Sequence, residues 1–182
     1  MIGTALKEAR TELRWPQRVV GLIAKVSESM VKEWEHDRRP MADEHKRRLS
    51  RGMNSGRLCM ALKNWVTGGI AAPYLDGANV DTHRLVMVER TIEEMREAIA
   101  ALEGVKSILL KPPDRTTAEE RQLVMDRLLE VIEADTAAEN ALARVAREYG
   151  LSLADLYDRH QEELIDKGFL EKEKGPQKRA AI

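Results

Sequence analysis

The stretch that decides the fold comprises residues 15–40 and reads Trp-Pro-Gln-Arg-Val-Val-Gly-Leu-Ile-Ala-Lys-Val-Ser-Glu-Ser-Met-Val-Lys-Glu-Trp-Glu-His-Asp-Arg-Arg-Pro. It predicts two short helices joined by a tight turn at Lys25 and Val26. Pro16 favours the start of the first helix, because its φ suits the first helical position and its missing N–H would have no helical partner. Ser27 is a good N-cap for the second helix, which we expect to end near Glu35 or His36.

Apolar residues in this stretch are spaced so that they meet in one small core, which we expect to contain Val20, Val26, Val31 and Trp34. The same helical spacing leaves polar residues on the outer face of the second helix. Two short helices that cross on a tight turn form a helix-turn-helix, whose second helix can enter the major groove of DNA.

The composition limits the class of protein. Of the 182 residues, 4% are aromatic and 34% are charged, and this mixture favours long helices with charged faces over a sandwich or a barrel. We therefore predict an all-α fold. The single Cys59 excludes an internal disulfide framework. The sequence contains neither a signal-peptide core nor an apolar run of the ~20 residues that a membrane span needs, so we expect a cytoplasmic protein.

Charge is distributed unevenly along the chain. Residues 1–66 hold fourteen Lys or Arg against eight Asp or Glu, whereas residues 67–182 hold sixteen against twenty-three. A basic front and an acidic back predict an N-terminal part that faces nucleic acid and a remainder with a different task.

Residues 67–82 separate the two parts, because three Gly, one Pro, two Asp and one Asn in this segment disfavour a helix. Ile70, Tyr74 and Leu75 indicate that this connector packs on its neighbours. We predict a DNA-binding domain over 1–66, a packed connector over 67–82, a helical dimerisation or regulatory domain over 83–170, and a flexible tail over 171–182.

A strong helix is predicted from about Thr82 to Leu102, with Gly104 as its stop. Its apolar residues are spaced by three and four, as in a coiled coil. This seam consists of Leu85, Val88, Ile92, Met95, Ile99 and Leu102. It packs either on later helices of the chain or on a second subunit. A capping box of Thr116 and Glu119 predicts the start of the next long helix.

Several residues stand at the intervals of a known pattern: Gln17, the small Gly21, Ser27, Val31 and the pair Trp34-Glu35. With Leu6 and Arg10 before them, they make residues 2–55 resemble the Cro/C1-type (XRE-like, phage repressor) helix-turn-helix family. The sequence departs from that family in five places. Gly21 replaces the usual alanine, which weakens its helix by ~1 kcal/mol. Lys25 and Asp37 replace glycines, and Leu22 and Ile23 replace polar residues.

The resemblance implies a Cro/C1-like helix-turn-helix domain followed by a C-terminal helical bundle or coiled coil. It implies a sequence-specific transcriptional regulator of phage, prophage or bacterial type that binds double-stranded DNA as a homodimer. The base contacts that it implies are Glu28, Ser29, Lys32 and Glu33. The expected phosphate contacts are Gln17, Arg14, Arg18, His36, Arg38 and Arg39.

Two alternatives suit the same pattern. One is a DNA-packaging recognition subunit of a phage that forms a ring, and the other is a protein-binding anti-repressor or antitoxin module. The acidic C-terminal helices also predict a protein partner. The four His and Cys59 do not show metal-ligand spacing, and the chain carries no motif of an enzyme, so we expect neither catalysis nor a metal or other cofactor.

Overall fold

The computed structural model describes residues 2–171, and the structure is discussed below for this part of the chain. It consists of eight α-helices and one short 3-10 helix, without a strand in the described part. The predicted all-α fold is confirmed. The predicted tail, except for Glu171, lies outside the described residues.

Five short helices form the head of the molecule: α1 (Ile2–Glu12), α2 (Gln17–Ala24), α3 (Glu28–Glu35), α4 (Asp43–Gly52) and α5 (Gly56–Thr67). They enclose one apolar core, in which Leu6, Leu49 and Leu58 are fully buried. Val20, Val31 and Trp34 of the opening stretch lie in this core, and Val26 packs at its edge. The core therefore joins α2 and α3 to the other three helices of the head.

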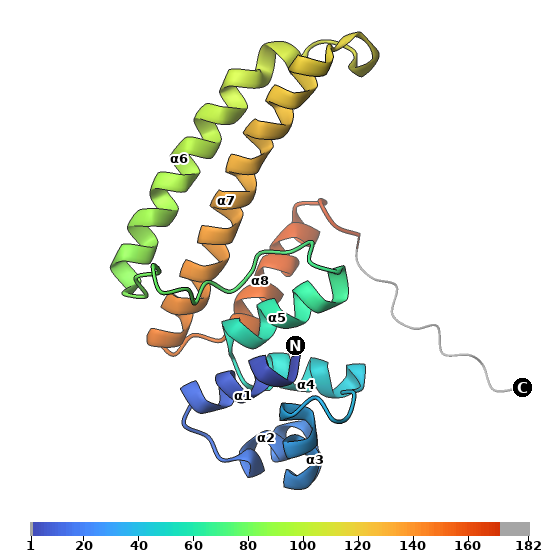
Figure 1. The fold of residues 1–182 in the computed structure, drawn as a ribbon, viewed down its shortest axis with the longest axis vertical. Helices are drawn as coiled ribbons and strands as arrows, with labels where there is room; N and C mark the ends of the chain where they lie inside the picture. The colour runs from blue at the N-terminus through green and yellow to red at the C-terminus, as the bar shows by residue number, and fades with distance from the viewer. Residues whose placement is uncertain (1, 172–182) are drawn as a thin grey trace, which may run out of the picture.

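Two long helices, α6 (Arg84–Leu109) and α7 (Ala118–Glu148), form an antiparallel hairpin that projects from the head (Figure 1). The short helix η1 (Pro113–Arg115) lies in the turn at the tip. The last helix, α8 (Leu153–Asp166), returns alongside the head. The hairpin tip and helix α3 thus lie at opposite ends of the molecule (Figure 1).

The predicted ends of the long helices need two corrections. Helix α6 continues through Gly104 to Leu109, because burial of Val105 outweighs the roughly 1 kcal/mol that an interior glycine costs a helix. The capping box of α7 lies one residue later than predicted. Thr117 Oγ1 accepts the Glu120 N–H at 3.2 Å, and Glu120 Oε2 accepts the Thr117 N–H at 3.1 Å.

Small side chains hold the two helices of the hairpin together. The buried residues of α6 are Thr91, Glu94, Ala98, Ala101 and Val105, and those of α7 include Ala134 and Ala141. Of the two alternatives for the α6 seam, packing on later helices of the same chain is not what the structure shows. Val88 is half-buried, and the other five seam residues are exposed: Leu85, Ile92, Met95, Ile99 and Leu102. Alanine allows the closer helix–helix approach, which leaves the larger side chains outside.

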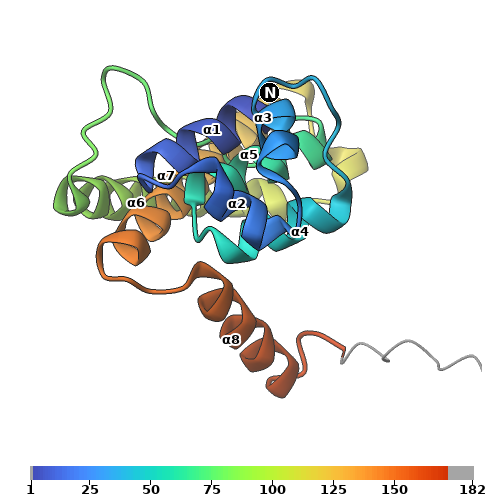
Figure 2. The same ribbon diagram turned by 90° about the horizontal axis from the view of Figure 1, so that it is seen from below.

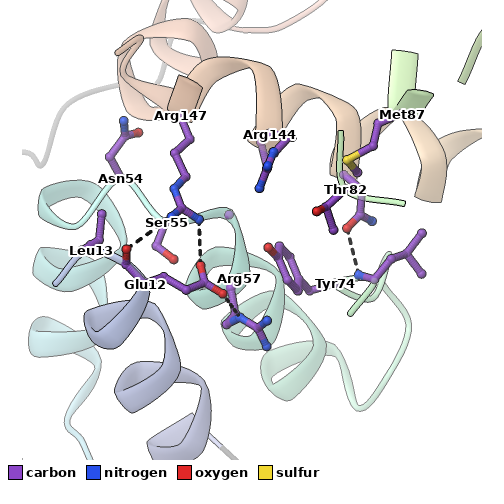
Figure 3. Close-up of a pocket in the computed structure, with 14 residues that line it drawn as sticks. Glu12, Leu13, Asn54, Ser55, Arg57, Tyr74, Thr82, Met87, Arg144 and Arg147 are labelled. Atoms are coloured by element: carbon purple, nitrogen blue, oxygen red, sulfur yellow. Dashed lines mark hydrogen bonds and ion pairs between the residues drawn. The ribbon is translucent and has the colours of Figure 1, made fainter. Parts of the chain in front are cut away.

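Ion pairs and side-chain hydrogen bonds fix the head against the hairpin (Figure 3). Glu12 at the end of α1 accepts from Arg57 Nε at 2.8 Å and from Arg147 Nη1 of α7 at 3.0 Å. The Asn140 side chain on α7 holds the connector, since its Oδ1 accepts the Leu75 N–H at 2.9 Å. The position of the hairpin is thereby transmitted to the helices of the head.

Gly56 tests this junction. A Cβ at position 56 would lie 2.3 Å from the Ala143 Cβ, so we expect Gly56→Ala to lower the free energy of unfolding by about 1–3 kcal/mol. Gly104→Ala is the matched control, because its new Cβ would meet nothing within 4 Å and should stabilise α6 by about 1 kcal/mol. Urea denaturation measures both changes. Stabilisation by both substitutions would contradict the tight contact between α5 and α7.

Candidate nucleic-acid interface

The turn between α2 and α3 brings two backbone segments close together. Lys25 ends α2 in the left-handed conformation, with φ of 59°. The Val26 N–H then donates to the Gly21 carbonyl at 2.9 Å. A Cβ at Gly21 would lie 2.8 Å from the Val26 carbonyl oxygen. The glycine that weakens α2 therefore permits the tight turn that sets the angle of α3.

Specific contacts hold both ends of α3. At its start, Ser27 Oγ accepts the Met30 N–H at 3.3 Å. Beyond its end, Asp37 has a left-handed φ of 52° and accepts the Gly3 N–H of α1 at 3.1 Å. Gly3 allows this approach, since a Cβ there would lie only 2.1 Å from the Trp34 carbonyl oxygen. Helix α3 is therefore supported by the chain's first turn.

A buried ion pair joins α1, α2 and α3. Arg10 Nε donates to Glu35 Oε1 at 2.5 Å, and Arg10 Nη2 donates to Glu35 Oε2 at 3.0 Å. Gln17 Nε2 of α2 donates to the same carboxylate at 2.7 Å. Only 1% of the Glu35 side chain is exposed. These three side chains therefore connect the three helices behind the outer face of α3.

The environment of Glu35 changes its pKa in two opposing ways. Burial raises the pKa of this carboxyl, whereas the hydrogen bonds from Arg10 and Gln17 lower it more, so the pKa lies below its ordinary value. The hydrogen bonds that Arg10 donates to Glu35 raise the pKa of Arg10. Both groups are charged at neutral pH. Each charge is compensated by the other and by hydrogen bonds, as burial of charged groups requires.

The outer face of α3 points away from the hairpin, at the end of the molecule seen from below in Figure 2. Of the predicted base contacts, Glu28, Ser29 and Lys32 are exposed on this face. Glu33 is partly covered and lies 3.6 Å from Arg38 at the nearest atoms. The structure thus places these four residues together, with one cation among three acceptor side chains.

The predicted phosphate contacts fall into two groups. Arg14 and Arg18 are exposed, and neither forms an ion pair within residues 2–171. The others have neighbours in the head. His36 Nδ1 lies 2.7 Å from the Lys32 carbonyl oxygen, and Arg39 Nη1 lies 3.8 Å from Met30 Sδ. Arg38 is next to Glu33. Because the Gln17 amide nitrogen is bonded to Glu35, its backbone N–H at the start of α2 is the better phosphate donor.

Most cations of α4 make contacts within the chain. Lys46 Nζ lies 3.6 Å from the centre of the Trp65 ring and 2.9 Å from Asp43. Arg48 pairs with Glu44, and Arg51 pairs with Asp158 of α8. These side chains therefore stabilise the head and its contact with α8, and they add less to the exposed basic surface than their number indicates.

Sequence reasoning did not predict the Arg10–Glu35 pair. The sequence pattern placed Leu6 and Ala9 on the buried side of α1, and Arg10 next to them was a weak sign of a buried partner. Of the two apolar residues that replace polar ones on α2, Leu22 remains 72% exposed, whereas Ile23 packs on the core of the head. An apolar side chain thus borders the outer end of the head.

No helix of the described part is long and apolar enough to cross a membrane. Within residues 2–171, no three His, Cys, Asp or Glu side chains are grouped so that they could hold a metal ion. Comparison of the chain with protein-family models, with curated proteins and with solved structures finds no match.

Glu35→Gln tests the buried pair. The substitution leaves Arg10 without its counter-charge, and we expect it to lower the free energy of unfolding by about 3 kcal/mol at neutral pH. Since the pKa of Glu35 is lowered on folding, its contribution is fully present above the unfolded pKa and is lost as pH falls through the folded pKa.

Urea denaturation at neutral and acidic pH checks this prediction. The difference between the wild-type protein and Glu35→Gln should shrink in acid. Glu28→Gln on the exposed face of the same helix is the control and should change stability little. An equal small effect of both substitutions would contradict a structural role for the pair.

Proposed function

We propose that the protein is a sequence-specific DNA-binding transcriptional regulator that inserts α3 into the major groove. The observation that carries this proposal is the exposed outer face of α3, at the end of the molecule opposite the hairpin tip (Figure 1). Helix α2 crosses behind α3 on a tight turn, as in DNA-binding helix pairs. The resemblance of residues 2–55 to the Cro/C1 family agrees with this use.

The chemistry of the outer face suits the reading of bases. Lys32 has donors for guanine O6 and N7, and Glu28 has acceptors for the cytosine amino group. The Ser29 hydroxyl donates or accepts. Arg14, in the turn before α2, and Arg18, on α2, are exposed and can neutralise phosphates, which supplies affinity without sequence choice. Regulation of phage, prophage or bacterial genes is part of the proposal.

Each alternative has one supporting observation. The exposed Leu22 of α2, together with the exposed carboxylate of Glu28 on α3, favours a protein-binding module over a DNA reader. The long hairpin with exposed apolar side chains suits a ring-forming packaging subunit as well as a dimer. Absence of DNA binding at low salt would support the protein-binding module. A closed ring of many subunits would support the packaging subunit.

Two substitutions separate base reading from phosphate contact. Lys32→Ala should reduce the preference for the bound sequence over random duplex by about 1–3 kcal/mol. Arg18→Ala should weaken both DNAs equally and reduce the salt slope by about one contact. Arg115→Ala, which removes an exposed cation at the hairpin tip, should alter neither.

Fluorescence anisotropy titrations at two salt concentrations, with a preferred and a random duplex, give these values. The base-reading role of Lys32 fails if its removal weakens binding to both duplexes by the same factor.

A further inference from the structure

The hairpin has an apolar surface that its own packing does not use. Thirteen large apolar side chains on α6 and α7 are between 38% and 60% exposed. They are Leu85, Val86, Ile92, Met95, Ile99, Leu102 and Leu109 on α6, and Leu123, Met125, Leu128, Leu129, Ile132 and Leu142 on α7. A single chain therefore presents to water the residues that normally form a core.

These side chains are not needed to hold the hairpin together. Within the chain, α6 and α7 meet through Ala98, Ala101 and their neighbours. Thr91 adds a hydrogen bond from its hydroxyl to the Ala137 carbonyl at 3.1 Å. The contact even contains the carboxylate of Glu94, whose Oε2 is buried without a hydrogen-bond partner in the described part. The larger apolar side chains of α6 and α7 therefore remain available for a contact outside the hairpin.

The exposed rows lie on one side of the hairpin. On α6, each of Ile92, Met95, Ile99 and Leu102 follows directly after a residue buried against α7. On α7, Leu142 follows the buried Ala141 in the same way, and Leu128 and Ile132 continue that row, which the exposed Asp135 after the buried Ala134 interrupts. One residue is a rotation of about 100°. Because the helices are antiparallel, rotation in the same sense along each chain directs both rows to the same side.

The size and pattern of this side fit a second copy of the same chain. Stable complexes bury ~800 Å² per partner, and the seven large side chains of the two rows, each 38% to 60% exposed, supply apolar surface for such a contact. The spacing of three and four along α6 is that of helices that pack in left-handed bundles. A two-fold axis would bring the same rows of two chains together, as an isologous contact requires.

We propose that two chains pair through this side of α6 and α7 to form a four-helix bundle, from which two heads project. The proposal extends the proposed function by naming the partner of the hairpin, and it rests on that function for its reason, since two heads read two half-sites. The junction through Glu12, Arg57 and Arg147 fixes each head to its hairpin. Pairing of the hairpins therefore sets the spacing between the two α3 helices.

The mass of the full chain in solution, without DNA, tests the interface. Sedimentation equilibrium should give twice the chain mass. Ile99→Glu should raise the dissociation constant of the dimer by about tenfold or more. Ile70→Glu makes the same change at an exposed residue of the connector and should have no effect. Far-UV circular dichroism confirms that each variant remains helical.

Disulfide cross-linking gives a second measurement that does not depend on destabilising the interface. In a Cys59→Ser background, Met95→Cys or Ile99→Cys should form a cross-linked dimer under mild oxidation. Glu97→Cys, which lies on the opposite side of α6, should not. Cross-linking through position 97 with none through 95 or 99 would overturn the assignment of the face.

The outcomes separate this proposal from the function on which it builds. A single-chain mass for the wild-type protein overturns the pairing, and so does a ring of many subunits. If that monomer still prefers one duplex sequence, only the interface is wrong. If a dimer forms through the predicted face but binds no DNA at low salt, the interface stands and the proposed function fails.

Discussion

The ion pair between Arg10 and Glu35 is the interaction on which the end of the head that carries α3 depends. It joins α1 to α3, and Gln17 of α2 donates to the same carboxylate. An apolar contact at this place would hold the three helices together with less directional control. The hydrogen-bond geometry of a guanidinium and a carboxylate fixes their relative positions. The outer face of α3 therefore has a rigid support, as a surface that distinguishes base pairs requires.

The head depends in turn on its junction with the hairpin. Glu12, at the end of α1, is paired with Arg57 of α5 and Arg147 of α7. The close contact of Gly56 with Ala143 leaves no room for movement between these elements without loss of packing. An arrangement of two hairpins would therefore be passed on to the two recognition helices as a fixed distance and angle. The rigid junction between head and hairpin and the pairing of two hairpins would act together to set the distance between the two α3 helices.

Part of the fold could be predicted from the sequence because it depends on local patterns. The all-α class follows from helical periodicity and composition, and Ser27 was recognisable as a cap. Other features depend on contacts between distant residues. Nothing in the spacing of Arg10 and Glu35 indicates that they meet. Gly104 resembles a helix stop in the sequence, and only the structure shows that Val105 of α6 is buried and that the helix continues.

The hairpin shows the same limit more clearly. The periodicity of Leu85 to Leu102 identified an apolar row, but it could not say that α7 would pack on the neighbouring row of small residues. A row of large apolar side chains predicts that the helix makes a contact, but it does not identify the surface that it contacts. For the candidate site, the sequence predicted which residues of α3 are exposed. It could not predict that Glu33 lies beside Arg38 or that Gln17 is bonded within the head.

Selection of bound sequences from random DNA by the full chain tests the central claim most directly. If α3 reads the major groove and two heads are joined through their hairpins, the enriched sequences will contain an inverted repeat. Its half-sites will be separated by about 10 base pairs or a multiple of that distance. Substitution of Lys32 should change the preferred bases within each half-site and leave the spacing unaltered. Recovery of no enriched sequence, at a salt concentration low enough for general binding, would contradict the account.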